Sequence, residues 1–135
     1  MRFAPSASEY RAIGTMAGQE LMEYFITRVA EVEEVWGLGD ETGWVMRELG
    51  EQTSLPVWPY QQLAHRCAVD DWQGQSCKSV SLEHFISHIL KLLIEQDIQI
   101  EIMPGESRQG YIMEPQHLYK MFEGVIESGE YFLEG

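Results

Sequence analysis

The chain has 135 residues and carries 22 Asp and Glu against 9 Lys and Arg, which gives a formal net charge of −13. This length is typical of one domain, and a hydrophobic content of 44% is too high for a disordered chain. The acidic balance argues against direct binding to nucleic acid, because such binding needs clustered Lys and Arg to displace counterions. We therefore expect a single folded domain over residues 1–135 that makes no direct contact with nucleic acid.

No targeting or membrane segment can be recognised in the sequence. A secretory signal needs an unbroken apolar stretch of about 7–15 residues, and polar residues and a proline interrupt residues 1–16. The longest apolar run within residues 82–96 is far shorter than the roughly 20 residues of a membrane-spanning helix. In a chain without a signal, Cys67 and Cys77 are expected to be reduced thiols rather than a disulfide. The sequence thus predicts a cytoplasmic protein that does not associate with membranes.

The predicted elements begin with a loose arm over residues 1–17 and a helix over residues 18–35. Apolar residues recur on one face of that helix, and acidic residues recur on another. Closely spaced glycines then indicate a turn at 39–43 between short strands at 35–38 and 44–48.

A third strand is predicted over residues 53–58, and it contains Pro56. Because proline cannot donate a hydrogen bond to a ladder, we expect this strand to be bent or to lie at a sheet edge. Pro59 suits the first turn of a short helix that ends near residue 69. A short strand is predicted at 77–80.

The strongest helix signal covers residues 82–96, with Ser81 as its N-cap. Its apolar face, an arc of roughly 160°, is formed by Leu82, Phe85, Ile86, Ile89, Leu90, Leu92 and Leu93. Strict alternation predicts a strand at 98–102 with one solvent-exposed face, followed by a partner strand at 111–113. Pro115 opens the last helix. Its predicted core residues are Leu118, Met121, Phe122, Val125 and Ile126.

This order of elements predicts an α+β fold. Consecutive strands joined by tight turns favour a mainly antiparallel sheet of about five or six strands, with three to four helices packed on it. We expect one domain, with the arm at 1–17 and an acidic C-terminal end at 127–135.

No complete catalytic set, cofactor motif or metal site is apparent in the sequence. His84 and His88 are spaced i, i+4, so one metal ion could reach both, but no third ligand lies near and both fall on the polar face. His65 and Cys67 point to different sides of a helix, and Cys67 is predicted to be a core residue. Neither a phosphate-binding glycine loop nor a nucleophile elbow is present. We therefore expect no catalytic residue, no metal and no cofactor, and favour a non-enzymatic protein over an enzyme.

Four tryptophans fall in the second quarter of the chain, near strand ends and turns. They are Trp36, Trp44, Trp58 and Trp72. Such rings can fill the core, or they can line a pocket or an interface, where Trp is enriched among the residues that dominate binding. Trp58 and Trp72 flank the predicted short helix and are the candidates for the second role.

Acidic residues gather in two stretches that contain no Lys or Arg. The first, residues 29–46, contains Glu31, Glu33, Glu34, Asp40 and Glu41. The second, residues 121–135, contains Glu123, Glu127, Glu130 and Glu134. Excess negative charge can serve solubility alone. It can also form a docking surface for a basic partner, since opposite potentials speed association.

Several segments carry a resemblance to known proteins. They are Val35-Trp36-Gly37-Leu38, Gly43-Trp44, Leu55-Pro56-Val57-Trp58-Pro59, Ala64 with Cys67-Ala68, Trp72-x-Gly74, and Val80-Ser81-Leu82-x-x-Phe85. Over about residues 18–126 the chain resembles a bacterial family of uncharacterised proteins, domain-of-unknown-function family 2750. The resemblance implies a compact, cytoplasmic, single-domain protein, and it supplies no catalytic residues. As a class, small acidic proteins of this kind are also similar to immunity proteins, which neutralise secreted toxin domains.

Together these observations predict a small acidic binding protein, most concretely an immunity protein that neutralises a basic toxin domain. The predicted partner-binding residues are Glu31, Glu33, Glu34, Asp40, Glu41, Trp58 and Trp72. The alternative is an enzyme or small-ligand-binding protein with a pocket near Trp58 and Trp72, beside His65 and Cys67. The apolar strands also permit a homo-oligomer.

Overall fold

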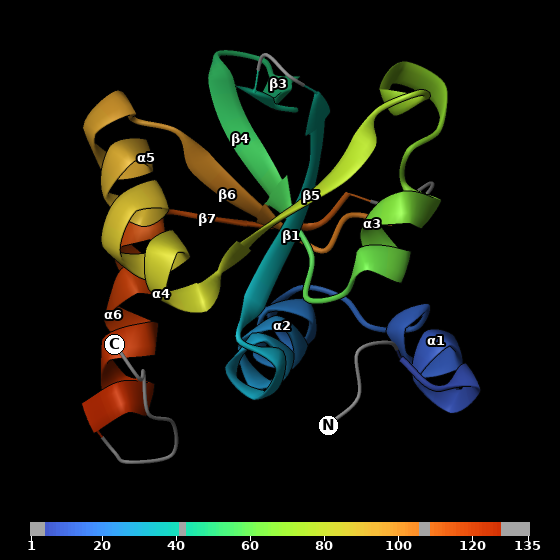
Figure 1. The fold of residues 1–135 in the computed structure, drawn as a ribbon, viewed down its shortest axis with the longest axis horizontal. Helices are drawn as coiled ribbons and strands as arrows, with labels where there is room; N and C mark the ends of the chain where they lie inside the picture. The colour runs from blue at the N-terminus through green and yellow to red at the C-terminus, as the bar shows by residue number, and fades with distance from the viewer. Residues whose placement is uncertain (1–4, 41–42, 106–108, 128–135) are drawn as a thin grey trace.

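The computed structural model describes residues 5–40, 43–105 and 109–127, and they form an α+β fold (Figure 1). This confirms the predicted fold class. The strands number seven over the described residues and form two sheets, where the sequence predicted one sheet of five or six strands.

The smaller sheet is antiparallel throughout. Its central strand is β1 (Glu34–Asp40), with β2 (Gly43–Trp44) on one side and β5 (Ser76–Ser81) on the other. The strands predicted at 35–38 and 77–80 are thereby confirmed, each slightly longer than expected.

The larger sheet is mixed. Its strands lie in the order β3 (Arg47–Leu49), β4 (Gln52–Val57), β6 (Gln99–Ile102) and β7 (Tyr111–Met113). The two outer pairs are antiparallel, but β4 and β6 run parallel. The expectation of a mainly antiparallel arrangement is therefore confirmed with one exception, at the centre of this sheet.

One backbone bridge joins the two sheets. The amide of Trp36 in β1 donates to the carbonyl of Trp58, just beyond β4, and the reverse bond is also made, both at 2.8 Å. Next to this bridge, the Trp44 ring closes over β1 at Gly37. A Cβ at Gly37 would lie 2.3 Å from the ring, so only glycine allows this approach.

The strand that contains Pro56 does not lie at a sheet edge, which was one of the two positions that the sequence predicted for it. Instead, β4 lies inside its sheet between β3 and β6. The carbonyl of Val57 accepts a hydrogen bond from the amide of Met103, at the β6 side. Successive residues of a strand direct their amides to opposite sides, so the position of Pro56 faces away from β6. On that side the pairing with β3 ends at Ser54. Proline is accepted here because no ladder bond is required of it.

The first helix, α1 (Ala7–Ile13), replaces the loose arm that the sequence predicted. The hydroxyl of Ser6 accepts a hydrogen bond from the amide of Glu9 at 3.2 Å and caps the helix. The helix predicted over residues 18–35 is confirmed as α2 (Gln19–Val32), which packs against β1, β6 and β7. Its buried face consists of Leu21, Met22, Phe25, Val29 and Val32.

The predicted short helix is α3 (Gln61–Arg66), which packs against β1 and β5. A single turn of 3-10 helix, η1 (Asp70–Trp72), follows it. The helix is shorter than predicted because it ends at Arg66, and residues 67–69 connect it to η1 without helical structure.

The helix predicted over residues 82–96 is confirmed, with a difference in its middle. It consists of α4 (Leu82–His84), a π-helical turn η2 (Phe85–Ile89) and α5 (Leu90–Gln96). The hydroxyl of Ser81 accepts from the amide of His84 at 3.1 Å, as expected of an N-cap. Leu92 is 47% exposed, so its predicted place on the buried face is wrong. A π turn changes the angle between successive side chains, and α5 therefore presents a face rotated from that of a uniform α-helix.

The last helix, α6 (Pro115–Glu127), begins at the predicted proline and packs against α5. Leu118 and Phe122 are buried as predicted, whereas Met121 is 38% exposed. The side chains of Val125 and Ile126 lie outside the described residues, as does the acidic end from residue 128 onward.

The helices lie around the two sheets in three groups. Figure 1 shows α4, α5 and α6 along one flank, α1 and α3 along the opposite flank, and α2 between them below β1. Within the described residues no helix combines the length and the apolarity that a membrane span requires.

Candidate functional site

Exposed carboxylates gather at the place where α2 ends and β1 and α4 begin. Glu33 ends α2 in the left-handed conformation, and its carbonyl accepts a hydrogen bond from the amide of Leu82 at 2.9 Å. Glu34 is the register partner of Ser81, so Glu83 lies close along the chain to this pairing. We call the set Glu31, Glu33, Glu34 and Glu83 the acidic corner. Glu34 is half-buried and the other three are exposed.

Arg28 offsets part of the charge of the acidic corner. Its Nη1 lies 2.6 Å from Glu31 Oε1, and its Nε lies 3.5 Å from Glu9 Oε2. Burial alone would lower the pKa of Arg28, but the charges of Glu31 and Glu9 raise it above its ordinary value. The acidic stretch therefore has a cationic partner, Arg28, one helical turn before Glu31. Arg28 was left out when Lys and Arg were counted over residues 29–46.

Asp40 lies apart from the acidic corner, at the other end of β1. The six residue steps from Glu34 to Asp40 along the strand correspond to about 20 Å. Near Asp40, the Nζ of Lys78 donates to the backbone carbonyl of Asp40 at 3.0 Å and lies 5.8 Å from the ring centre of Trp44. Glu41 lies outside the described residues. The described acidic residues of the stretch at 29–46 thus lie at the two ends of β1 rather than together.

The two candidate tryptophans have different environments. Trp58 is only 1% exposed, and its indole N–H donates to the carbonyl of Pro104 at 3.0 Å. Trp72 is half-buried and meets the Trp58 ring edge-on, with ring centres 6.3 Å apart. The prediction that Trp58 offers its ring to a protein partner conflicts with this burial, whereas Trp72 keeps an accessible part.

An ion pair between a buried carboxylate and a half-buried guanidinium lies beside these rings, and no pattern in the sequence predicted it. Glu101 is 0% exposed, which overturns the prediction of a solvent-exposed face on β6. Its Oε1 lies 2.8 Å from Nε of Arg47, and its Oε2 accepts a hydrogen bond from the amide of Gly110 at 2.9 Å. The guanidinium of Arg47 also lies over the Trp72 ring, 4.7 Å from its centre. Alternation alone could not reveal this pair, because its two residues are far apart in sequence.

A cavity of about 310 Å³ lies between α1, α3 and the chain that follows β6. Trp58 and Cys67 line it, as the alternative hypothesis expected, but Trp72 and His65 are not among its lining residues. Arg66 and Tyr10 also line it, and the guanidinium of Arg66 lies 4.3 Å from the centre of the Tyr10 ring. The cavity could not be predicted because α1 falls in the segment that the sequence suggested to be loose.

Both cysteines are free thiols. Cys67 is buried, which confirms its predicted place in the core, and its Sγ donates to the carbonyl of Pro104 at 3.1 Å. Cys77 is half-buried, and burial raises the pKa of its thiol. A raised pKa keeps Cys77 protonated at neutral pH, so it is a poor nucleophile.

His84 and His88 lie on the exposed side of their helix, with their rings stacked at 4.6 Å. The Oγ of Ser87 lies 2.7 Å from Nδ1 of His88. Over the described part of the chain, no three His, Cys, Asp or Glu side chains lie close enough together to share a metal ion.

The chain matches a known protein family. The model of a family described as protein of unknown function (DUF2750) matches residues 22–122, which is more than half of the chain. This range runs from α2 to α6 and leaves out α1. No curated protein and no solved structure matches the chain.

Proposed function

The chain belongs to the family DUF2750, whose description names no activity, and from its own surface we propose that it is a binding protein that docks a basic protein partner. In its most concrete form it is an immunity protein that neutralises a cationic toxin domain. The observation that supports this function is the acidic corner, in a chain of net charge −13.

Charge and position make the acidic corner suitable for docking. Three of its four carboxylates are exposed, so they can approach a partner without first losing their whole hydration shell. The four residues of the acidic corner lie on or next to α2, β1 and α4, which are fixed to one another by the backbone contacts of Glu33, Glu34 and Ser81. Preorganised charges of one sign speed encounter with an oppositely charged surface and exclude partners of like charge.

Two variants of equal net charge test this function. The corner variant carries Glu31→Gln, Glu33→Gln, Glu34→Gln and Glu83→Gln. The control variant carries Glu20→Gln, Glu23→Gln, Glu95→Gln and Glu123→Gln, all at exposed positions on other parts of the helices. Each set removes four negative charges, so both variants change from −13 to −9. Affinity for a panel of basic nuclease toxin domains is measured by calorimetry at low and high salt.

We expect a domain that binds the native protein to bind the corner variant at least tenfold more weakly, and the control variant within about threefold. We also expect affinity to fall as salt rises, since salt screens charges that remain near solvent. An equal loss in both variants would show that only overall charge matters. Insensitivity to salt, or failure of the whole panel to bind, would also contradict the proposal.

A second function, the binding of a small ligand, is favoured by a separate observation. The cavity beside Trp58 has the size of the smaller known ligand sites, which begin at about 300 Å³. The buried tryptophan, which is ill placed to meet a protein, is well placed to contact a molecule inside the fold.

A further inference from the structure

The walls of the cavity are mostly apolar side chains from three separate parts of the chain. Ile13 belongs to α1, Leu63 belongs to α3, and Met103 directly follows β6. All three side chains are buried. A volume of about 310 Å³ accommodates a small molecule, such as a single ring with a short substituent, rather than a nucleotide or a peptide.

The floor of the cavity is held in a fixed conformation. Met103 has a φ of 54°, which is unusual for a residue other than glycine, and its amide is bonded to the carbonyl of Val57 at 2.9 Å. The next carbonyl, that of Pro104, accepts hydrogen bonds from both the Trp58 indole and the Cys67 thiol. A carbonyl oxygen has two lone pairs, so these two bonds use its accepting capacity. The Pro104 carbonyl therefore has no lone pair left for a ligand, and the backbone beside it, at Met103, is strained.

A single charged side chain lines the described part of this cavity, and it is Arg66. Its guanidinium lies over the half-buried Tyr10 ring, while Arg66 itself is exposed, so the charge sits where the cavity meets solvent. A guanidinium is planar and carries five N–H donors, and arginine therefore binds carboxylates in a charge-assisted, often bidentate, geometry.

We propose that this cavity binds a small carboxylate with one apolar body, either an aromatic ring or a short acyl chain. The body occupies the space between Ile13, Leu63 and Met103, against the edge of Trp58. The carboxylate pairs with Arg66 at the mouth. This proposal rests on the ligand-binding function stated above and adds to it the chemical class of the ligand.

The test compares acids with their neutral isosteres. Phenylacetate and hexanoate are the acidic probes, and phenylacetamide and hexanamide match them in shape without the charge. Binding to the native protein is measured by calorimetry and by saturation-transfer NMR. We expect both acids to bind and each amide to bind at least tenfold more weakly, the difference that a charge-assisted pair adds to apolar contact.

Three variants and one control variant assign the binding to the cavity and to Arg66. Arg66→Gln should weaken the acids about tenfold and leave the amides within about twofold, and Arg66→Lys should restore part of the preference for acids. Arg11→Gln is the matched control, because Arg11 is an exposed arginine of α1 that does not line the cavity. We expect Arg11→Gln to change no affinity by more than about twofold. Because Gly14 lines the cavity with an ordinary φ of −61°, Gly14→Leu should weaken acids and amides alike.

The outcomes distinguish a failure of the carboxylate class from a failure of ligand binding itself. Equal binding of acids and amides, or equal effects of Arg66→Gln and Arg11→Gln, would overturn the carboxylate class while leaving a ligand site. Absence of binding by all four probes, or binding that Gly14→Leu does not weaken, would overturn the ligand-binding function itself. Thermal unfolding of each variant shows whether its fold is kept. If Arg66→Gln is unstable, the comparison of Arg66→Lys with Arg11→Gln still tests the role of Arg66.

Discussion

At the scale of single residues, Glu101 connects parts of the chain that are distant in sequence. Its carboxylate binds Arg47 of β3 and the amide of Gly110 before β7. Arg47 in turn lies over Trp72, whose ring meets that of Trp58. These contacts place one negative charge inside the fold, next to a cation and a backbone donor. A buried carboxylate is tolerated under this condition.

We expect Glu101→Gln to lower the free energy of unfolding by about 2 kcal/mol. The amide can still accept from Gly110, but it cannot compensate the charge of Arg47, and removing one partner of a buried pair leaves the other unsatisfied. Urea unfolding measures the change, with Glu48→Gln as the control at an exposed position of β3. A loss below about 0.5 kcal/mol, or a loss equal to that of the control, would contradict the role given to Glu101.

The residues that escaped sequence analysis share a physical cause. Alternation identified the apolar residues Ile100 and Ile102 correctly, and both are buried. It assigned Glu101 to solvent because charged residues are rarely buried without a partner, and its partner comes from β3. The burial of Trp58 depends likewise on Pro104, 46 positions away. Such contacts leave no local pattern to detect.

At the scale of elements, one polar cluster fastens α1 to α2. The hydroxyl of Tyr24 in α2 donates to Glu9 of α1 at 2.9 Å, and Arg28 of α2 lies 3.5 Å from the same carboxylate oxygen. Burial and the neighbouring Glu9 raise the pKa of Tyr24 well above its ordinary value of 10.0. Because α1 forms one wall of the cavity, this cluster also supports the proposed ligand site.

The raised pKa of Tyr24 predicts a loss of stability at high pH. The folded state favours the neutral phenol, so its contribution is complete below pH 10, the ordinary pKa, and is lost as pH rises above that value. We expect unfolding free energies at about pH 9 and pH 11 to show a drop that is smaller in Tyr24→Phe. Tyr119→Phe is the control, since Tyr119 has no partner role in this cluster. An identical drop in the native protein and Tyr24→Phe would contradict the assignment.

Elements defined by local signals were predictable, and those defined by distant pairing were not. Apolar periodicity and caps located α2, the helix over 82–96 and α6, with Ser81 at its expected place. The parallel pairing of β4 with β6 depends on a long crossover, and no local signal in either strand specifies it. The π turn was missed because the apolar periodicity of residues 82–96 identifies a helix without specifying its hydrogen-bond pattern. The capped helix α1 was missed because seven residues are too few to give a clear periodicity.

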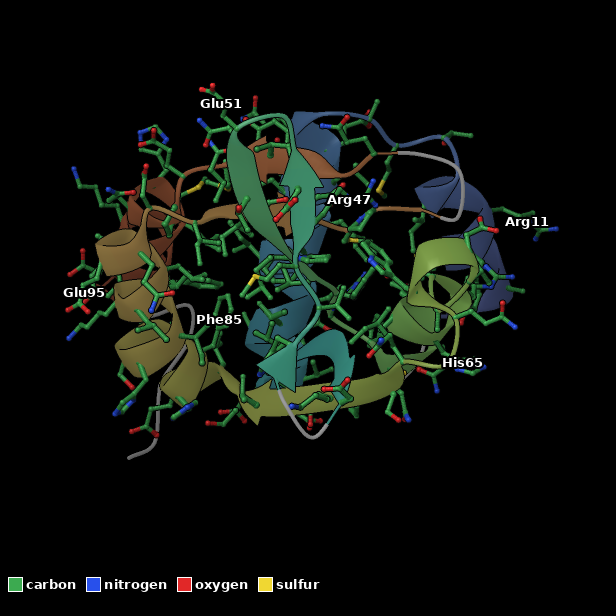
Figure 2. The ribbon with its side chains drawn as sticks, turned by 90° about the horizontal axis from the view of Figure 1, so that it is seen from above. Arg11, Arg47, Glu51, His65, Phe85 and Glu95 are labelled. Carbon is green, nitrogen blue, oxygen red and sulfur yellow. The ribbon has the colours of Figure 1, made fainter. Side chains whose placement is uncertain are left out.

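At the scale of the whole molecule, charge and cavity occupy different regions. The acidic corner lies beside α4, whereas the cavity lies between α1 and α3 on the opposite flank (Figure 1). Figure 2 shows Arg11 and His65 at the end of the molecule that carries α1 and α3 and Glu95 at the other end, with Phe85 on the inner side of the helices there. A protein partner at the corner and a small acid in the cavity would therefore not compete for one surface, and each proposal can fail without the other.

Amide chemical-shift mapping by NMR locates the surface on which a basic protein docks. A basic toxin domain that binds is added to the isotope-labelled native protein at low salt. We expect the largest shift changes in two segments, residues 31–34 and 81–84, with little change at residues 63–67 of α3. Shift changes that are spread evenly over the exposed carboxylates, or concentrated on α1 and α3, would contradict docking on the acidic corner.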